Sequence, residues 1–354
     1  MSLFKVALVL LALFSSLSWA SDPIDVSDYQ VEHLLCGKAH FYAFRSFIEG
    51  KIQKYVVVNT LTLKSSVVDA QKMKDCAETP IGSGNPYFDA VNEYTSSPEA
   101  LGACQGFKSF PTNCSDRAPL VLTTDLCPSN KPALDWEKQI KPFLENVAAL
   151  KAAGERGTPI VFSATGLWLE QHQDELKEIE KFAADKKLDI TWANHSYDHG
   201  TLPRVFSNPR TGFLTQKTEK QFKAEVLDAE KVMLQNGLTP SPFFRFPGLF
   251  STDKQVYQLR DMGMIPLNTS AWLALKNTPP KYYAECGMGD QRPGPGKVIL
   301  VHSNGNEPAG IALANTMMDK NKAEINFISL QQAVRCDVAA KKVAPAAVSV
   351  SALK

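Results

Sequence analysis

The stretch Asn194-His195-Ser196-Tyr197-Asp198-His199-Gly200 carries two imidazoles four positions apart, directly after the strand-like apolar run 188–193. If the chain coils into a helical turn as it leaves the strand, residues i and i+4 lie on one face. Their ring nitrogens would then converge on a cation the size of Zn²⁺. Two histidines at this spacing also arise by chance, so other residues must support a metal site.

Short apolar runs alternate with amphipathic helical patterns from residue 119 onward. Strands are expected at 120–124, 160–162, 188–193, 243–246, 264–267 and 298–301. Asn236-Gly237 closes one of the intervening helices and Thr252 begins another. The repeated strand–helix order predicts an α/β fold with a parallel sheet, and the number of units favours a distorted (β/α) barrel of about seven strands.

Four sets of polar residues follow expected strands: Asp125, the pair His195 and His199, Arg245, and His302. In parallel β/α barrels the working groups sit at the carboxyl ends of strands. Taken singly, Asp125 could cap a helix, His302 could be a hydrogen-bonded core histidine, and Arg245 could form a surface ion pair of little value. Their common placement favours a functional site.

The same residues resemble the motifs of NodB-like polysaccharide deacetylases (carbohydrate esterase family four), and the resemblance covers about residues 119 to 305. The first motif, Thr-Phe-Asp-Asp-Gly, is matched by Thr-Thr-Asp-Leu-Cys at 123–127. The second, His-Ser/Thr-x-x-His, is matched in full at 195–199. The third, with Arg and Pro, is matched at 245–248, and the fifth, Leu-x-His, at 300–302.

Two positions depart from the family pattern. Leu126 stands where the family has a second, metal-ligating Asp, and the fourth motif, which usually has Asp before Trp, reads Asn-Thr-Ser-Ala-Trp at 268–272, with Ala271 before the Trp. A site held by two histidines would have to borrow Asp125, another carboxylate or waters. Metal affinity should then fall, because a catalytic zinc normally keeps three protein ligands and one open position.

The resemblance implies a hydrolase of carbon–nitrogen bonds that removes N-acetyl, or O-acetyl, groups from a polysaccharide or amino-sugar oligomer. His195 and His199 would hold a divalent metal, Zn²⁺ with Co²⁺ or Ni²⁺ as alternatives. The metal would polarise the acetyl carbonyl and lower the pKa of a water that acts as the nucleophile.

The same resemblance gives the remaining residues their roles. Asp125 would be the general base and His302 the general acid that protonates the leaving nitrogen. Arg245 would hold Asp125 ionised and oriented. Trp272 and Leu300 would line the pocket for the acetyl methyl group.

Two other functions stay open on the sequence. Leu126 and Ala271 are compatible with a carbohydrate-binding protein that keeps the scaffold but has lost turnover. Cys127, beside the expected base, could be the nucleophile of a different amide hydrolase, although a structural cysteine is the commoner case because a reactive thiol needs an electropositive, accessible setting.

Composition restricts the partners. The chain has 354 residues, of which 21% are charged and 44% apolar, and a net charge of +1. These values are ordinary for a folded soluble protein, and no block of Lys and Arg indicates nucleic-acid binding. An acetylated glycan is the expected partner, and a monomer the expected state.

The N-terminus has the pattern of a secretory signal peptide, with Lys5, an apolar run over 6–17 and small residues before a cut after Ala20. No later run is long and apolar enough to span a bilayer. We therefore expect export to the periplasm or the medium. The domain plan is a signal peptide at 1–20, an N-terminal extension or cap of unknown role at 21–118, a catalytic barrel at 119–337 and a disordered tail at 338–354.

The extension is the least readable part. A helix-like start is expected at 31–35 and a strand at 55–59. All seven cysteines follow the expected cut, where disulfides persist, and an odd number leaves at least one unpaired. Cys104 and Cys114 enclose a short polar loop and are the pair expected to bridge.

Overall fold

The computed structural model describes residues 23–96, 104–129, 136–150, 157–200, 213–273, 283 and 294–343. The expected signal peptide and residues 344–354 of the expected tail lie outside this part. The helix α9 (Leu330–Val343) continues past residue 338, so residues 338–343 of the expected tail are helical. Within the described residues, no helix is long and apolar enough to cross a membrane.

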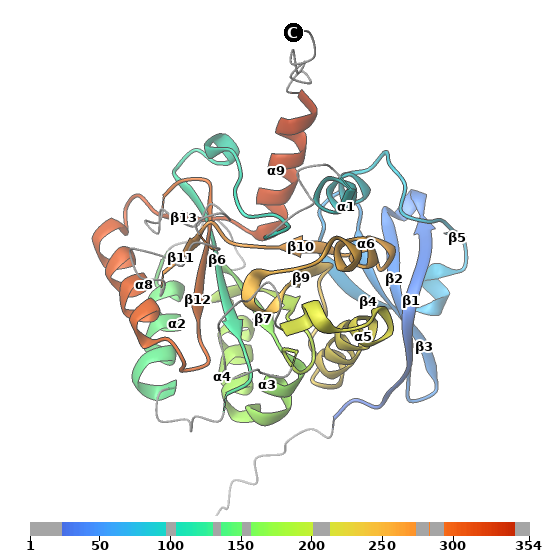
Figure 1. Ribbon diagram of the computed structural model, residues 1–354, viewed down its shortest axis with the longest axis horizontal. Helices are drawn as coiled ribbons and strands as arrows, with labels where there is room; N and C mark the ends of the chain where they lie inside the picture. The colour runs from blue at the N-terminus through green and yellow to red at the C-terminus, as the bar shows by residue number, and fades with distance from the viewer. Residues whose placement is uncertain are drawn as a thin grey trace, which may run out of the picture.

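The region from residue 119 onward is a curled parallel sheet, as predicted (Figure 1). Seven strands follow the order β10-β9-β8-β7-β6-β12-β11, and β13 pairs with the start of β6. Their bounds are β6 (Pro119–Leu126), β7 (Thr158–Ala164), β8 (Leu188–Asn194), β9 (Phe243–Arg245), β10 (Ile265–Leu267), β11 (Ala271–Trp272), β12 (Lys297–His302) and β13 (Asn326–Phe327). The six strands expected from apolar runs are all present, and β11 and β13 are additional.

Helices cover the outer face of this sheet. They are α2 (Lys141–Ala148), α3 (Gly166–Gln171), α4 (Gln173–Ala184), α5 (Glu219–Gln235), α6 (Asp253–Asp261) and α8 (Pro308–Asn321). Shorter helical turns are η5 (Trp136–Ile140), η7 (Phe213–Gln216) and η8 (Pro247–Leu249). The expected Thr252 cap is present as a capping box with Gln255. Even-numbered residues of β6, such as Leu122 and Leu126, pack against α2, α3, α4 and α8 in one large apolar cluster.

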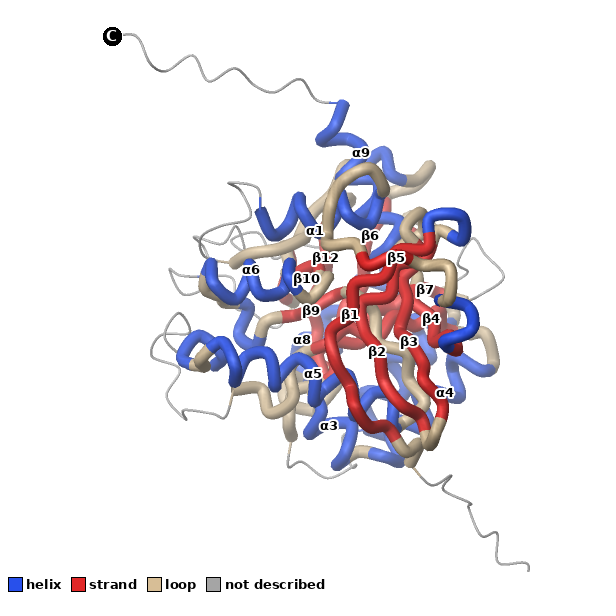
Figure 2. Tube along the Cα trace, turned by 90° about the vertical axis from the view of Figure 1, so that its right-hand side faces the viewer, coloured by secondary structure: helices blue, strands red, loops and turns tan. Residues whose placement is uncertain are grey.

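The N-terminal region is an antiparallel sheet with strand order β4-β3-β2-β1-β5 (Figure 2). Its strands are β1 (Val26–Cys36), β2 (Phe41–Glu49), β3 (Ile52–Asn59), β4 (Ser65–Asp69) and β5 (Ala77–Glu78), followed by α1 (Pro86–Ser96); η1 (Gly37–Ala39), η2 (Ala70–Met73) and η4 (Thr112–Cys114) are short turns. The strand expected at 55–59 is correct. The helix expected at 31–35 is wrong, because these residues belong to β1 and pair with β2.

The N-terminal sheet and the parallel sheet share one apolar cluster. It joins Tyr42 and Phe44 of β2 to Val121, Ile265 and further residues near the beginnings of the parallel strands. Arg45 of β2 adds a fully buried ion pair with Glu230 of α5, at 2.6 Å between Nε and Oε2. The N-terminal sheet is therefore packed on the parallel-sheet region through a common core.

The segment 104–110 connects the edge strand β10 to the start of β12. The N–H of Phe107 donates to the Pro266 carbonyl at 2.9 Å, and its own carbonyl accepts from Asn268 at 2.8 Å. On the other side the N–H of Phe110 donates to the Gly296 carbonyl at 2.9 Å. Gly106 has φ 109°, and a Cβ there would lie 2.4 Å from the Pro266 carbonyl oxygen, so only glycine permits this approach.

The disulfides differ from the expected bridge. Cys36 pairs with Cys76, and Cys114 pairs with Cys336 of α9, so the predicted Cys104–Cys114 bridge is wrong. Cys104 is itself disulfide-bonded. The first pair lies within the N-terminal sheet region. The second ties the chain just before β6 to the last helix.

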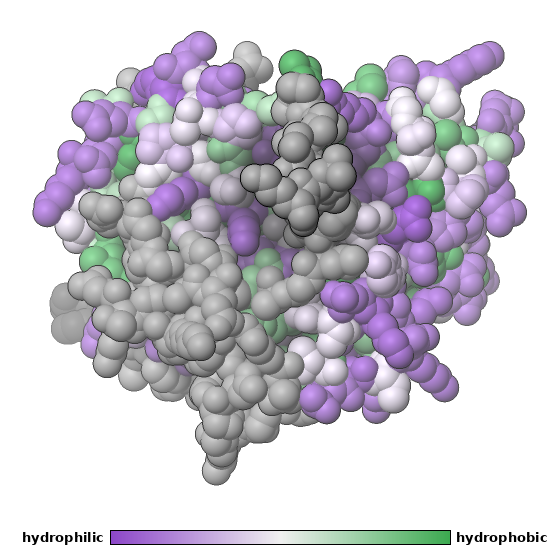
Figure 3. Space-filling model, turned by 45° about the horizontal axis from the view of Figure 1, so that its top comes forward, coloured by the Kyte–Doolittle hydropathy of each residue, from purple (hydrophilic) through white to green (hydrophobic). Residues whose placement is uncertain are grey.

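Large apolar side chains on the surface are scattered. The exposed ones are Ile52, Leu61, Tyr257, Leu313 and Val343, which lie on five different elements or turns. Figure 3 shows hydrophilic residues over most of the described surface on one face, with apolar ones in small groups. Scattered residues of this kind are normal for a folded protein and mark no interface.

Candidate active site

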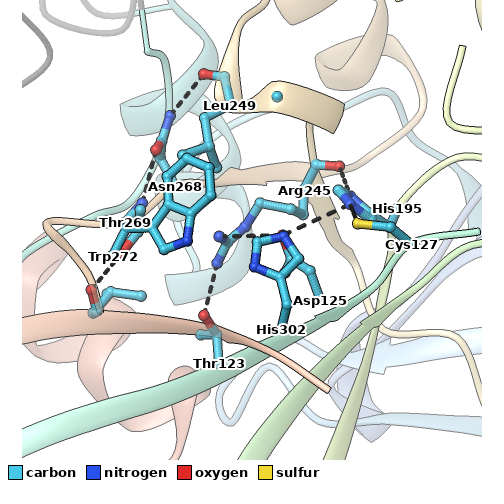
Figure 4. A network of polar contacts seen from close by, with 12 residues as sticks. Thr123, Asp125, Cys127, His195, Arg245, Leu249, Asn268, Thr269, Trp272 and His302 are labelled. Atoms are coloured by element: carbon cyan, nitrogen blue, oxygen red, sulfur yellow. Dashed lines mark hydrogen bonds and ion pairs between the residues drawn. The ribbon is translucent and has the colours of Figure 1, made fainter. Parts of the chain in front are cut away.

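The predicted polar residues meet at one edge of the parallel sheet (Figure 4). Asp125 is the second-to-last residue of β6 and is paired in register with His302, the last residue of β12. His195 directly follows β8, and Arg245 ends β9. Because all these strands are parallel, their carboxyl ends place the four side chains together, as the sequence indicated.

The ring of His195 is buried and held in one orientation. Its Nδ1 lies 2.8 Å from the carbonyl oxygen of Arg245, which can only accept, so Nδ1 carries the proton. The lone pair of Nε2 then faces Asp125 Oδ2 at 3.7 Å and Cys127 Sγ at 3.5 Å. Burial lowers the pKa of His195, but the negative Asp125 and Cys127 raise it more, and the net shift is upward. The site thus attracts a positive charge.

His199 reaches the same place, but not through a helical turn. The rings of His195 and His199 are edge to face with centroids 4.9 Å apart. Ser196 and His199 adopt left-handed backbone angles, φ 69° and 66°, so the helical geometry expected for this segment is wrong. Such angles are costly for residues other than glycine and persist only where the surroundings hold them.

Side chains around the turn supply that support. The carboxylate of Glu225, on α5, accepts from the N–H groups of Tyr197 and Asp198, both at 3.0 Å. Asn194 Oδ1 accepts from the N–H of Ser196 at 2.8 Å. These bonds fix the backbone between the two imidazoles, and the sequence patterns gave no sign of Glu225.

Cys127 completes a group of three possible ligands. One ligand atom each from Cys127, His195 and His199 lies within 4.8 Å of the other two. Cys127 has a free thiol. Burial raises its pKa, but His199, His195 and His302 lower it more, so the pKa lies well below the ordinary value of a thiol. This residue was considered on the sequence only as a nucleophile or as a structural cysteine.

Arg245 and Asp125 face each other in a buried setting. Arg245 Nη1 lies 3.8 Å from Asp125 Oδ2, and Nη2 donates to the Thr123 hydroxyl at 3.0 Å. Burial lowers the pKa of Arg245 more than Asp125 and Cys127 raise it. Asp125 Oδ1 and Arg245 Nε and Nη1 make no hydrogen bond among the described residues. Buried polar atoms without partners are rare, and here they surround the place where a reacting molecule would bind.

His302 has a carboxylate partner that the sequence did not reveal. Glu307 Oε2 lies 2.8 Å from His302 Nδ1, although the angle is poor for a hydrogen bond, and it accepts from Trp272 Nε1 at 2.9 Å. Burial lowers the pKa of His302, but Cys127 and Glu307 raise it more, so it lies well above the ordinary value. The only signal for Glu307 was its position just before Pro308, at the start of α8.

The two residues expected to contact the acetyl group lie beside this carboxylate. Trp272 is partly buried, and its ring lies 5.5 Å from that of His302 between centroids. Leu300 is buried in a small apolar cluster against which Trp272 packs. The expected apolar wall therefore lies next to the expected general acid.

The donor set fits a borderline d-block cation. Two imidazole nitrogens and one thiolate leave a fourth tetrahedral position open, which is the arrangement of a catalytic zinc site with three protein ligands. The hydrogen bond from His195 Nδ1 to the Arg245 carbonyl is the usual way in which a protein orients an imidazole that binds a metal. The residues present thus fit the metal that the resemblance implies.

Residues 116–266 match the family model described as polysaccharide deacetylase. This segment contains the strands β6 to β10 and the histidine pair. The resemblance seen in the sequence is therefore confirmed over this segment.

The chain is also similar to several solved structures. A family 4 carbohydrate esterase from Bacillus anthracis is 18% identical with a TM-score of 0.44, over 72% of this chain and 94% of that one. PdaA of Bacillus subtilis, a family 4 carbohydrate esterase, is 20% identical with a TM-score of 0.44, over 71% and 90%. A mutant of a family 4 pseudoenzyme with restored activity is 13% identical with a TM-score of 0.42, over 88% and 93%.

Proposed function

We propose that this protein is an exported, metal-dependent hydrolase that removes N-acetyl, or O-acetyl, groups from a polysaccharide or amino-sugar oligomer. One observation carries the proposal: the base candidate, the acid candidate and the histidine pair meet at one strand edge, with Asp125 Oδ2 3.7 Å from His195 Nε2. The disulfides and the N-terminal sequence pattern support export.

His195 and His199 would hold the divalent metal. When bound, this ion would polarise the acetyl carbonyl and make a water acidic enough to react near neutral pH. The lone pair of His195 Nε2 is available for it, because Nδ1 is engaged by the Arg245 carbonyl. Zn²⁺ is the metal that this donor set favours, with Co²⁺ or Ni²⁺ as alternatives.

Asp125 would take the proton from the attacking water. Its carboxylate is buried, and the guanidinium of Arg245 lies beside it, with Nη1 3.8 Å from Oδ2. Its Oδ1, without a hydrogen bond among described residues, is the atom free to accept that proton.

His302 would give its proton to the leaving nitrogen. It stands opposite Asp125 in the β6–β12 register, so the base and the acid flank one point. The ion pair with Glu307 at Nδ1 would orient the ring and leave Nε2 for the reacting group. Trp272 and Leu300 would contact the methyl of the acetyl group.

Acetate release tests the proposal. The purified protein, with added Zn²⁺ or Co²⁺, should release acetate from chitin oligomers, peptidoglycan or small acetyl esters, and EDTA should stop it. His302→Ala should lower kcat by about 100-fold or more, the usual value of a general acid. His40→Asn, an exposed histidine in the N-terminal sheet region, is the matched control and should leave the rate unchanged.

A carbohydrate-binding protein without turnover remains the second candidate, and Leu126 and Ala271 favour it. Glycan binding that survives His195→Ala, with no acetate from any of the three substrate classes, would establish that function. Metal-dependent release that is lost in His302→Ala would exclude it.

A further inference from the structure

The missing family carboxylate cannot be supplied at position 126, because the strand turns that side chain away. Side chains alternate along a strand, so Asp125 and Leu126 point to opposite faces of β6. Leu126 is fully buried among apolar residues that pack against the helices. The next residue on the Asp125 side is Cys127.

Cys127 occupies the place where a third ligand is needed. Its Sγ lies 3.5 Å from the Nε2 of His195, and its sulfur and the two imidazoles lie within 4.8 Å of one another. Its carbonyl accepts from Asn304 Nδ2 at 3.1 Å, which anchors the backbone at the end of the strand. This hydrogen bond from the segment after β12 fixes the backbone of Cys127 and thereby helps to position its side chain.

The redox state of the cysteines is an independent observation. Cys36, Cys76, Cys114 and Cys336 form disulfides, and Cys104 is bridged as well. Cys127 is the free thiol of the described residues. With seven cysteines at least one must stay unpaired, and the unpaired one among the described residues lies beside the two imidazoles.

We infer that Cys127 is the third protein ligand of the metal, so that a thiolate replaces the carboxylate of the family pattern. The ion would be held by one sulfur and two nitrogens. Such a set selects Zn²⁺ or Co²⁺ and discriminates against Mg²⁺ and Ca²⁺, which prefer oxygen ligands. The inference rests on the metal site of the proposed function but not on the release of acetate.

The rival role for the same sulfur is that of a nucleophile. A nucleophilic thiolate would attack the carbonyl carbon itself, and the nearby imidazoles would serve proton transfer instead of metal binding. The two roles differ in what the metal does to the sulfur. A sulfur that binds the metal is protected from other reagents while the ion is bound, whereas a nucleophilic sulfur reacts without any metal.

The spectrum of the Co²⁺-loaded protein tests the ligand directly. Thiolate coordination gives a sulfur-to-cobalt charge-transfer band in the near ultraviolet, besides the visible ligand-field bands of a tetrahedral site. We expect both in the native protein. Cys127→Asp should keep the visible bands and lose the charge-transfer band. Cys127→Ser should lower the metal affinity by at least about 100-fold, since loss of mere supporting groups already costs 10–100-fold.

Alkylation provides the second readout. Zn²⁺ should slow the reaction of Cys127 with iodoacetamide by at least about tenfold, because the metal occupies the thiolate. The disulfide cysteines do not react, and Cys127→Ser serves as the blank.

Three results would overturn the inference: visible cobalt bands without charge transfer in the native protein, no uptake of Co²⁺, or alkylation that Zn²⁺ does not slow. The third result, together with acetate release that survives EDTA and ends on alkylation, would establish the nucleophile. The charge-transfer band without acetate release would support the ligand and refute the proposed function.

Discussion

The carboxylate of Glu307 lies 2.8 Å from Nδ1 of His302, which leaves the other ring nitrogen, Nε2, as the proposed proton donor. The family pattern has an acidic residue before the Trp of its fourth motif, and this chain has Ala271 there. Glu307 also accepts from the Nε1 of that Trp, Trp272. We infer that Glu307 is a positioning residue that replaces the missing carboxylate from the start of a helix.

Replacement of Glu307 should therefore act through His302. Glu307→Gln should lower kcat by roughly tenfold or more with little change in KM, because the acid loses the charge that orients it. Its pH profile should shift, and Glu307→Asp should recover part of the rate. Steady-state kinetics checks this, with the exposed Glu324→Gln as the control. An unchanged pH profile in Glu307→Gln would show that the contact has no part in the reaction.

Restoring the family residue at position 126 should fail. Leu126→Asp would place a carboxylate in an apolar cluster where the side chain is 0% exposed. We expect a loss of more than about 3 kcal/mol in the free energy of unfolding and no gain in metal affinity. Leu126→Met, of similar volume, should cost less than about 1.5 kcal/mol. Denaturant unfolding measures both; tighter metal binding by a stable Leu126→Asp protein would contradict the described strand end.

The turn between the two imidazoles should depend on Glu225. Glu225→Ala removes the acceptor of two backbone N–H groups beside left-handed residues, so His199 loses its fixed position. Metal affinity should fall by about tenfold or more, as for other supporting groups of metal ligands. Competition with a chelator measures it. Asp228→Ala, an exposed change on the same helix, should leave the affinity as it is.

The buried pair Arg45–Glu230 should contribute to stability only while both members are present. Glu230→Gln leaves the fully buried guanidinium without its counter-charge, and the expected loss is about 3–5 kcal/mol in the free energy of unfolding. The double variant Arg45→Met/Glu230→Leu should lose much less, because no charge remains buried. Equal losses in the two variants would mean that the pair matters only through packing.

The parallel sheet and its polar edge could be predicted because buried strands are short apolar runs. Each run from 120–124 to 298–301 became a strand, and Asp125, His195, Arg245 and His302 lie at the shared edge. The histidine pair converged, though by a different backbone path, since residues four apart can meet in a tight turn as well as in a helix. The alternation of β6 would have placed Cys127 on the Asp125 side, had the expected strand been extended to residue 127.

Other features depend on contacts that leave no local pattern. In β1 the register shifts between Ser27 and Gln30 and between Val31 and Leu34 break the alternation of a strand, so apolar residues at 31, 34 and 35 have helical spacing. The Cys114–Cys336 bridge joins residues 222 positions apart. Glu307 and Glu225 act through space on residues of other elements, and no spacing rule connects them.

The strip of backbone from Cys104 to Phe110 has a consequence for any attempt to trim the protein. It precedes the segment that matches the family model, yet its N–H groups donate to the carbonyl of Pro266 in β10 and to the carbonyl of Gly296 just before β12. Removal of the chain up to residue 118 would leave the peptide groups of Pro266 and Gly296 without these hydrogen bonds. It would also expose the apolar cluster that the N-terminal sheet shares with the parallel sheet. The segment that matches the family model is therefore shorter than the segment that must be present for folding. The chain from residue 119 onward should unfold or aggregate when it is expressed by itself.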